Sequence, residues 1–451
     1  MVIKIHNTLT RKKEIFKPIK RDEINFFVCG PTAYSYAHIG NFKTYTQFDI
    51  IVNYLRHRKF KVNYIQNLTD IDDKIIHQAK ESKEDPLKLS EKFCKIFIDD
   101  MESLDNTAVS KYIKATERLS DIISQVERLL KKEFAYQTSD GIYFNLEKNK
   151  DYGKLSGRTV LQAEDATTRV DHSKEKKNKG DFCLWKFSDE GISWDAPFGK
   201  GRPGWHIEDT AITEKEFGSQ YDIHGGAVDL IFPHHEAEIA QMESISNKKP
   251  FVKYWMHTGF LDMKKEKMSK SVGNIITIRE LLKKQKKETI RFFFASQHYR
   301  NRIEFSEEIL EQSKNSLKKI NDFITNLDKE DNDGTLKQLK EDFYNAMDDD
   351  FNTQKAITIL YEFMNESNKT NTGGKQTLEF FKDINNIFKT FAFKGNIPKE
   401  IDDLAKEREL ARESKDWNQS DKLRSQIESK GYHIEDRKNG YALSGTGIPP
   451  I

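Results

Sequence analysis

The chain has little cysteine and no long apolar run. Its three cysteines, Cys29, Cys94 and Cys183, are too few and too scattered for a disulfide framework, which indicates a reducing compartment. No apolar stretch approaches the ~18 residues that cross a bilayer, and the N-terminal residues hold no apolar segment of a signal peptide. We therefore expect a soluble cytoplasmic protein that does not enter a membrane.

The net charge is also small. Lysine and arginine number 74 and aspartate and glutamate 72, which gives a formal charge of +2. This balance excludes a histone-like protein or a polybasic membrane binder, and any nucleic-acid contact must come from local patches. The length of 451 residues is too great for one core and predicts roughly three domains of ~150 residues each.

Hydrophobic periodicity predicts an α/β fold. Residues 24–28 form a short apolar run that ends at a turn, residues 38–55 carry apolar side chains at helical spacing, and residues 62–67 alternate as a strand. Strand, helix and strand in this order indicate a βαβ unit and a parallel sheet. Two further strands, at 181–185 and 221–224, are assigned to the second half of this sheet and its approaches.

The C-terminal third has a different pattern. Residues 308–393 are expected to be all helical, and residues beyond 398 form short charged helices and a glycine-rich tail, typical of a small terminal domain. The helical region carries a largely apolar stripe made of Phe343, Ala346, Met347, Phe351, Ala356, Leu360 and Phe363.

A first candidate site lies where the first strand meets its helix. His38, Gly40 and Asn41 stand at the expected helix N-terminus, whose unpaired N–H groups and positive dipole suit a phosphate. Gly40 would let a nucleotide approach the backbone, and His38 could donate to an α-phosphate under attack. The alternative is a helix-capping histidine beside a turn glycine.

A second candidate site is the loop that contains Lys267, Met268, Ser269, Lys270 and Ser271. Two ammonium groups on such a loop can follow the β- and γ-phosphates of a nucleotide and stabilise the leaving pyrophosphate without proton transfer. The alternative is a solvated turn in a lysine-rich protein. The occurrence of both motifs in this order, with a sheet between them, favours the nucleotide site.

A third constellation bears on the substrate. Cys29 ends the first strand, and His234 and Glu238 lie four residues apart on one face of a later helix. Thiolate, imidazole and carboxylate are ligands that zinc accepts. A coordinated metal would lower the pKa of an incoming thiol and so separate cysteine from serine, which an apolar pocket does poorly. The alternative is a buried cysteine and a surface helix pair.

Longer segments carry a resemblance. The stretches VCGPTAYSYAHIGN, QNLTDIDDKI, DFCLWK, GKGRPGWHIEDTAI, DIHGGAVDLIFPHHEAEIAQ, TGFLDMKKEKMSKSVGN, ETIRFFFASQHYR and AMDDDFNTQKA occur in this order. Together they resemble the bacterial cysteinyl-tRNA synthetases, a family of class I aminoacyl-tRNA synthetases, over nearly the whole chain. The resemblance implies activation of L-cysteine with ATP and Mg²⁺, followed by esterification of the terminal adenosine of tRNA(Cys), by a protein expected to be a monomer.

The resemblance also implies a Rossmann-type parallel sheet split by a connective insertion, followed by a helical bundle and a small C-terminal domain. The expected ranges are a first half of the catalytic core at 1–125, the insertion at 126–185, the second half at 186–255, a linking domain with the lysine loop at 256–307, the bundle at 308–395 and an anticodon-binding domain at 396–451.

In the family, zinc is held by two cysteines, a histidine and a glutamate. Cys29, His234 and Glu238 match three of these positions, and this chain has Asp209 where the family has the second cysteine. Aspartate binds zinc through oxygen, so a site of Cys29, Asp209, His234 and Glu238 would have a similar formal charge and a harder donor set. Alternatively, Asp209 only supports the ligands, or the protein holds no metal.

Other roles follow from the resemblance alone. Gly30, Thr69 and Trp205 correspond to the cysteine pocket, and Gly226 and Asp229 to the sheet edge that meets adenosine. The alternative for the last two is a turn glycine and an aspartate cap.

Several C-terminal positions have competing interpretations. Arg291 and the cluster 298–300 could contact the inner corner of tRNA or be solvated. For Trp417, core anchoring is favoured over base stacking. Asp436 and Arg437 lie where the family reads the anticodon.

Three other functions fit part of the pattern. A nucleotidyltransferase should be shorter and lack the helical C-terminal third. A ligase that joins cysteine to an amino sugar resembles the catalytic half but lacks an anticodon domain. A catalytically dead RNA-binding relative should have lost Lys267 and Lys270, and both are present.

Overall fold

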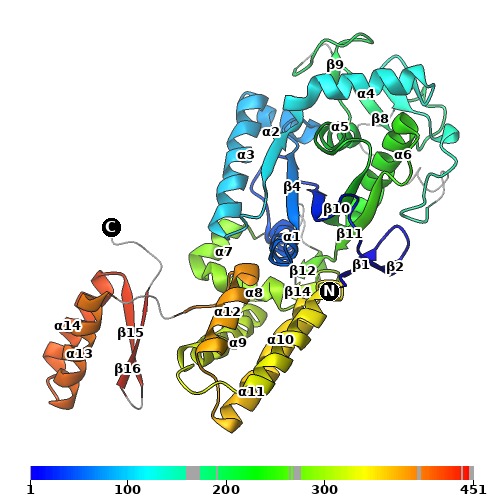
Figure 1. Cartoon of the computed structure of the whole chain (residues 1–451). Helices are drawn as coiled ribbons and strands as arrows, with labels where there is room; N and C mark the ends of the chain where they lie inside the picture. Colours follow the sequence, from blue (N-terminus) through cyan, green and yellow to red (C-terminus); the bar gives the residue numbers. More distant parts are fainter. Residues whose placement is uncertain are drawn as a thin grey trace.

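The computed structural model describes residues 2–158, 173–188, 191–263, 266–267, 276–393, 398–437 and 440–445. A five-stranded parallel sheet of order β11-β10-β3-β4-β5 lies within the larger part of the molecule (Figure 1) and confirms the predicted α/β class. Its strands are β3 Glu23–Val28, β4 Lys61–Leu68, β5 Lys111–Lys114, β10 Tyr221–Ala227 and β11 Val252–Thr258. The helices that accompany them are α1 Ile39–His57, α2 Asp73–Ser82, α3 Pro86–Ser103, α4 Leu119–Lys131, α5 Trp205–Phe217 and α6 His234–Ser246.

The strand order reverses beside β3. The chain runs outward from β3 through β4 to β5, and then returns to place β10 and β11 on the other side of β3. In open parallel sheets a ligand binds in the crevice beyond the carboxyl ends of the strands at such a reversal. Cys29 follows β3 directly, so the topology places it at this crevice.

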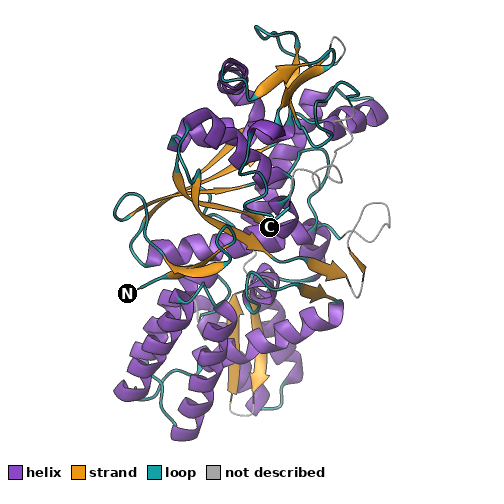
Figure 2. Cartoon of the chain, turned by 90° about the vertical axis from the view of Figure 1, so that its right-hand side faces the viewer, coloured by secondary structure: helices purple, strands orange, loops and turns teal. Residues whose placement is uncertain are grey.

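Two hydrophobic cores form because successive side chains of a strand point to opposite faces of the sheet. On β3, Phe26 packs into the core that contains α1, whereas Phe27 packs into the core that contains α5 and α6. Cys29 has the same parity as Phe27 and lies on the α5 and α6 side. Figure 2 shows helices on both faces of these strands.

A four-stranded antiparallel sheet contains the strands of the expected insertion. Its order is β6-β7-β8-β9, with β6 Ala135–Gln137, β7 Gly141–Phe144, β8 Cys183–Phe187 and β9 Gly201–Pro203. The strand expected at 181–185, assigned to the second half of the parallel sheet and its approaches, does not join the parallel sheet, because β8 pairs with β7 and β9. The antiparallel sheet therefore extends past residue 185. The division of the chain into domains stays a prediction.

A small sheet and a helical bundle follow the parallel sheet along the chain. The sheet consists of β12 Leu261–Met263, β13 Glu266–Lys267 and β14 Ile303–Phe305, with α7 Ile278–Lys284 and α8 Lys287–Ala295 between its strands. The bundle helices are α9 Glu307–Thr325, α10 Asp333–Asp348, α11 Thr353–Thr370 and α12 Lys375–Phe388. All seven residues of the predicted apolar stripe are buried in one core with α1 and α8. The N-terminal hairpin is β1 Lys4–Asn7 and β2 Lys12–Ile15.

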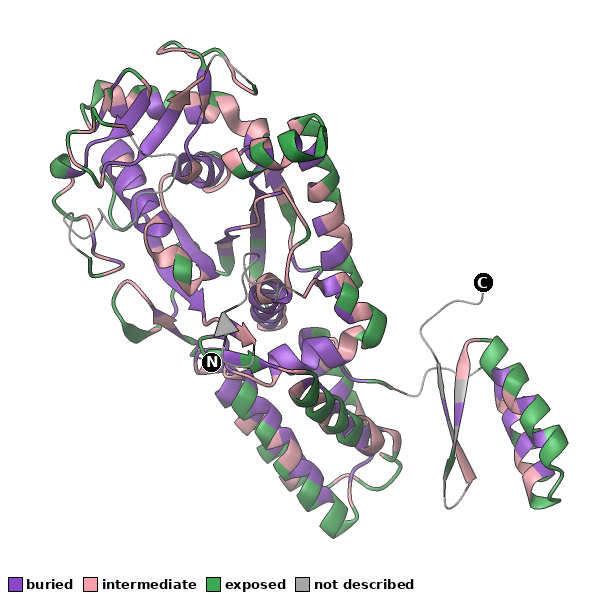
Figure 3. Cartoon of the chain, turned by 180° about the vertical axis from the view of Figure 1, so that it is seen from behind, coloured by how far each residue is buried: buried purple, intermediate pink, exposed green. Residues whose placement is uncertain are grey.

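The C-terminal unit has its own core and stands apart from the bundle in Figures 1 and 3. It contains α13 Lys399–Glu413, α14 Trp417–Ser429, β15 Tyr432–Arg437 and β16 Gly440–Gly445. Trp417 was expected to anchor this core, which was wrong: its side chain is 59% exposed at the first turn of α14, whereas Leu423 and Ile427 are buried. Within the described ranges, no helix has the length and apolarity needed to cross a bilayer.

Candidate metal and nucleotide site

The four predicted metal ligands converge on the α5 and α6 side of the sheet. His234 Nε2 lies 3.1 Å from Asp209 Oδ2 on α5 and 2.9 Å from Glu238 Oε1, one turn further along α6. One donor atom from each of Cys29, Asp209, His234 and Glu238 can be chosen so that all lie within 4.8 Å of one another. His234 and Glu238 therefore lie on one face of α6, as their four-residue spacing predicted.

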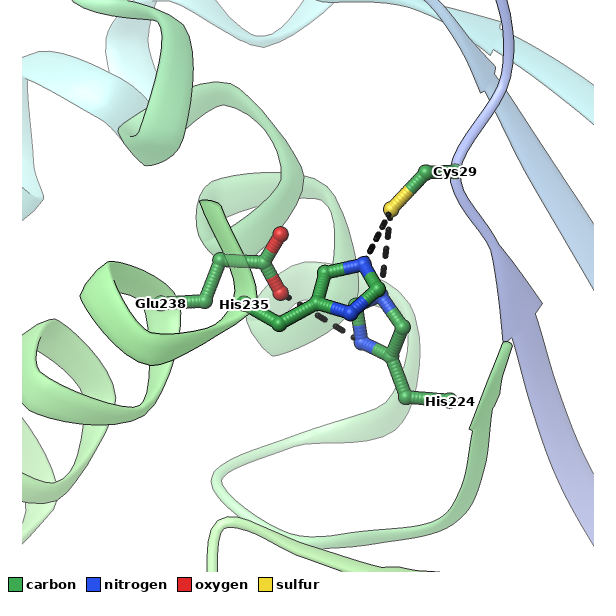
Figure 4. Close-up of side chains that lie close together, drawn as sticks. All are labelled: Cys29, His224, His235 and Glu238. Atoms are coloured by element: carbon green, nitrogen blue, oxygen red, sulfur yellow. Dashed lines mark hydrogen bonds and ion pairs between the residues drawn. The ribbon is translucent and has the colours of Figure 1, made fainter. Parts of the chain in front are cut away.

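Two further histidines share this centre and were missed. His224 on β10 and His235 on α6 place their Nε2 atoms 3.2 Å and 3.1 Å from Cys29 Sγ (Figure 4). With Cys29 and Glu238 they form a second set of four donors within the same 4.8 Å limit. His235 could have been noticed as the neighbour of His234, but His224 reaches Cys29 only because β10 lies beside β3.

The cluster is suited to a cation. All six residues are buried. Within the described part of the chain, Asp209 Oδ1 and both carboxylate oxygens of Glu238 accept no hydrogen bond, although His234 and His224 lie at ion-pairing distance from Glu238. Leaving buried charged oxygens without donors is costly, and a bound cation would remove that cost. The thiol, imidazole and carboxylate donors fit zinc.

Burial and the two carboxylates of the cluster shift the pKa values of its thiol and imidazole groups. Burial raises the pKa of Cys29 well above its usual value, and the Asp209 and Glu238 carboxylates raise it further. Burial alone would lower the pKa of His234, but Glu238 and Asp209 raise it to about 9. Burial lowers the pKa of both His224 and His235, which keeps them neutral. A divalent cation would reverse the situation of Cys29 and favour its thiolate.

Outer partners fix the orientation of the rings. Trp205 stacks on His234 with ring centroids 4.2 Å apart, and His206 Nδ1 lies 2.9 Å from His234 Nδ1. The Tyr221 hydroxyl lies 2.6 Å from His224 Nδ1. Such contacts to the second ring nitrogen are typical of histidines that bind metals.

A chain of hydrogen bonds extends from this cluster to the N-terminal hairpin. His235 Nδ1 lies 2.8 Å from His257 Nε2, and His257 Nδ1 lies 2.8 Å from the Thr8 hydroxyl. Burial lowers the pKa of His257 to about 3, so the chain carries neutral rings.

A cavity of about 300 Å³ lies next to this cluster at the carboxyl end of β3. It is lined by residues that the sequence predicted, among them Cys29, Gly30, His38, Gly40, Asn41 and Asp229. His38 is the N-cap of α1: its Nδ1 accepts a hydrogen bond from the Gly40 N–H at 3.1 Å, and Asn41 completes a capping box. The capping interpretation is therefore correct for His38, and the same residue also lines the cavity.

The remaining predicted pocket residues lie nearby. Gly30 packs against β4, where an added Cβ would be 1.8 Å from Asn67 O, and a Cβ at Gly226 would be 2.8 Å from His235 Cε1. Thr69 is buried at the end of β4. Trp205 lines a separate cavity of about 40 Å³ together with Glu208, a buried carboxylate that the sequence analysis missed.

The predicted loop of residues 267–271 lies almost wholly outside the described residues. Met268, Ser269 and Lys270 lie outside the described residues, and of Lys267 only the backbone in β13 is described.

Both interpretations of Arg291, contact with tRNA and exposure to solvent, were wrong, and the same holds for Tyr299. Arg291 is completely buried and pairs with Asp49, and Tyr299 is buried with its hydroxyl on Asp350. Neither is solvated or available to RNA. In the C-terminal unit, the Asp436 carboxylate receives three arginines, Arg408, Arg412 and Arg424. The Arg437 side chain lies outside the described residues.

Comparisons with known proteins agree with this geometry. A family described as "tRNA synthetases class I (C) catalytic domain" matches residues 15–315, and a DALR domain matches residues 342–392. A solved structure of Mycobacterium tuberculosis methionyl-tRNA synthetase in complex with methionyl-adenylate has a similar fold, with a TM-score of 0.61 at 15% identity over 82% of this chain and 88% of that chain. Fold and site together define a class I aminoacyl-tRNA synthetase.

Relatives with higher sequence identity show which family within this class the chain belongs to. The cysteine–tRNA ligase of Thermococcus onnurineus is 41% identical over 98% of both chains, and that of Methanococcus maripaludis strain S2 is 44% identical over 96% of this chain and 97% of the relative. The chain belongs to the cysteine–tRNA ligase family. Both relatives are archaeal, so the expected likeness to bacterial members in particular is not supported.

Proposed function

We propose that this chain activates L-cysteine with ATP and transfers it to the 3′-terminal adenosine of tRNA(Cys). The observation that carries the proposal is the convergence of Cys29, Asp209, His234 and Glu238 beside the cavity that His38 and Gly40 line. Amino acid and nucleotide would then meet beyond the carboxyl end of β3, where the strand order reverses.

The four donors are proposed to hold one zinc ion. Bound there, zinc would take the substrate's sulfur as a thiolate, which a serine hydroxyl cannot match near neutral pH. Neighbouring residues hold the donor atoms in position. Trp205 and His206 orient His234. His224 and His235 lie against the Cys29 sulfur. Gly30 and Thr69 are proposed to complete the cysteine pocket.

At the nucleotide end, the N-terminus of α1 supplies positive potential for the α-phosphate. Because His38 Nδ1 accepts from the Gly40 N–H, the neutral ring carries its proton on Nε2 and can donate it in a hydrogen bond to a phosphate oxygen. Asn41, Gly226 and Asp229 are proposed to contact the nucleotide, which brings Mg²⁺ with it.

Lys267 and Lys270, with Met268 and Ser269 between them, are proposed to neutralise the leaving pyrophosphate. Positioning and electrostatics are sufficient for such a phosphoryl centre, so no general base is assigned. A monomeric state, a place in the cytoplasm, the domain ranges and an anticodon role for residues 396–451 remain predictions of the sequence.

The test is cysteine-dependent exchange of pyrophosphate into ATP, run beside charging of a tRNA(Cys) transcript. We expect both activities, strong preference for cysteine over serine, and loss of that preference after metal is stripped. Exchange without charging would favour a ligase with another acceptor. Undiminished selection of cysteine by protein free of transition metals would overturn the metal assignment. Undiminished exchange in Lys270→Ala would overturn the role of that lysine.

A further inference from the structure

Lys43 on α1 is a buried cation bonded only to backbone oxygens. Its side chain is fully buried, and Nζ donates to Gly259 O at 2.5 Å, Asn301 O at 3.1 Å and Tyr299 O at 3.2 Å. Among the described residues, no carboxylate lies within 4.0 Å of this ammonium. Three carbonyls that converge on one nitrogen require three N–H groups, which only the charged form provides.

Burying an unpaired ammonium is costly. Burial lowers the pKa of Lys43 to about 7, and no acidic residue opposes the shift. A leucine or methionine would fill the same space without this penalty. The presence of a lysine at this buried position is therefore explained by the three backbone segments that its hydrogen bonds join.

These bonds join three separate segments. Lys43 lies one turn after Gly40, at the nucleotide end of α1. Gly259 follows β11, and Tyr299 and Asn301 lie in the turn before β14. The two turns touch so closely that a Cβ at Gly259 would be 2.4 Å from Asn301 O.

The neighbouring residue on α1 strengthens the same junction. The Thr44 hydroxyl lies 2.7 Å from the hydroxyl of Thr258, the last residue of β11. Gly259 and Leu261 line the nucleotide cavity, and Leu261 begins β12, which pairs with β13. The junction therefore fixes where the segment that leads to Lys267 starts, relative to His38.

We propose that Lys43 is a positioning residue for the nucleotide: its ammonium joins the N-terminal half of α1 to the turn that opens the β12–β13 hairpin, so that both sides of the ATP site keep their spacing. The inference rests on the proposed function. It predicts that Lys43 matters for ATP and not for cysteine, because the metal cluster stands on β3, β10, α5 and α6, none of which bonds Lys43.

The test compares Lys43→Met, which keeps length and loses charge, with Lys43→Arg, which keeps the charge and offers five donors. The control is Lys389→Met. This lysine is half-buried, its Nζ donates to Asp105 O at 2.9 Å and Thr107 Oγ1 at 2.8 Å and lies 3.6 Å from Asp49 Oδ2, and it is not among the residues that line the nucleotide cavity. In pyrophosphate exchange we expect Lys43→Met to raise the KM for ATP at least about tenfold, and to leave the KM for cysteine and the zinc content within about twofold. Lys43→Arg should restore most of the loss, and Lys389→Met should leave both KM values unchanged.

A purely structural role would give a different result. It would lower the stability of Lys43→Met and raise the KM values for ATP and cysteine together. That outcome overturns the proposal. An unaltered KM for ATP in Lys43→Met overturns it as well. If Lys43→Met does not fold, Lys43→Gln provides two neutral donors and the same comparison. Calorimetric titration of each variant with ATP alone needs no chemistry, so it tests Lys43 even if the wild-type chain shows no cysteine-dependent exchange.

Discussion

Replacement of Arg291 by methionine should destabilise the protein far more than loss of an ordinary surface charge. The Arg291 side chain is 0% exposed and its Nη2 lies 2.9 Å from Asp49 Oδ2, which is also buried. The guanidinium further donates to Leu104 O at 2.9 Å, Asn106 Oδ1 at 2.6 Å and Phe388 O at 3.0 Å. It thus connects α1, the segment after α3, α8 and the end of the bundle.

The magnitude follows from what the substitution leaves behind. Methionine fills part of the volume, but the Asp49 carboxylate stays buried without its main partner, and breaking such a pair costs about 3–5 kcal/mol. The matched control is Lys95→Met, which removes the exposed pair with Asp99 on α3, where side-chain exposures are 77% and 44%. Exposed pairs contribute about 0–1 kcal/mol.

The assay is urea unfolding followed by circular dichroism, with both variants beside the wild type. Arg291→Met should move the transition to clearly lower urea, and Lys95→Met should barely move it. The double variant Arg291→Met with Asp49→Leu should recover part of the loss, because the fully buried carboxylate is then gone, while the half-buried Lys389 loses its contact with Asp49. Equal shifts for the two single variants would refute the reasoning.

Three other predictions concern a proposed metal ligand, a glycine beside the site and a buried thiol. Asp209→Ala should weaken zinc binding at least about tenfold, whereas Asp209→Cys should keep one zinc per chain; equilibrium dialysis measures both, and wild-type affinity in the alanine variant would remove Asp209 from the ligands. Gly30→Ala should cost about 1–3 kcal/mol and reduce pyrophosphate exchange, because its Cβ would clash with β4, whereas Gly334→Ala, at an open helix start, should be neutral. Burial raises the pKa of Cys94 to about 12, so this thiol should resist Ellman's reagent at pH 8 until the protein unfolds; rapid labelling of the native protein would contradict its burial.

The sequence predicted the parts of the fold that depend on local pattern. The apolar run at β3, the helical spacing of α1 and the alternation of β4 all correspond to observed elements, and the stripe around Phe343 is buried as expected. The strand near 183 was real, but the sequence did not show which strands pair with it, because alternation within a strand does not determine which strand lies beside it. Trp417 was misplaced for a related reason, since helical spacing does not show whether the first turn of a helix is covered.

In the site, too, local spacing was predictable and contacts between distant segments were not. His234 and Glu238 could be paired from their spacing, and Asp209 came from the resemblance. His224, by contrast, meets Cys29 only across two strands that are far apart in sequence. Arg291 was expected either to contact RNA or to be solvated, because a charge in a helical sequence is normally exposed, and only the packing of α8 against α1 reveals its burial.

The hydrogen bond between Thr8 and His257 has a practical consequence for anyone who dissects this enzyme. The catalytic-domain match begins at residue 15, so a fragment cut to that boundary would discard the hairpin strand from which Thr8 extends. His257 Nδ1 would lose its hydroxyl partner at the outer end of the row of imidazoles that leads through His235 to Cys29. A shortened version of the protein should therefore keep the first strand, even though this strand lies outside the matched domain.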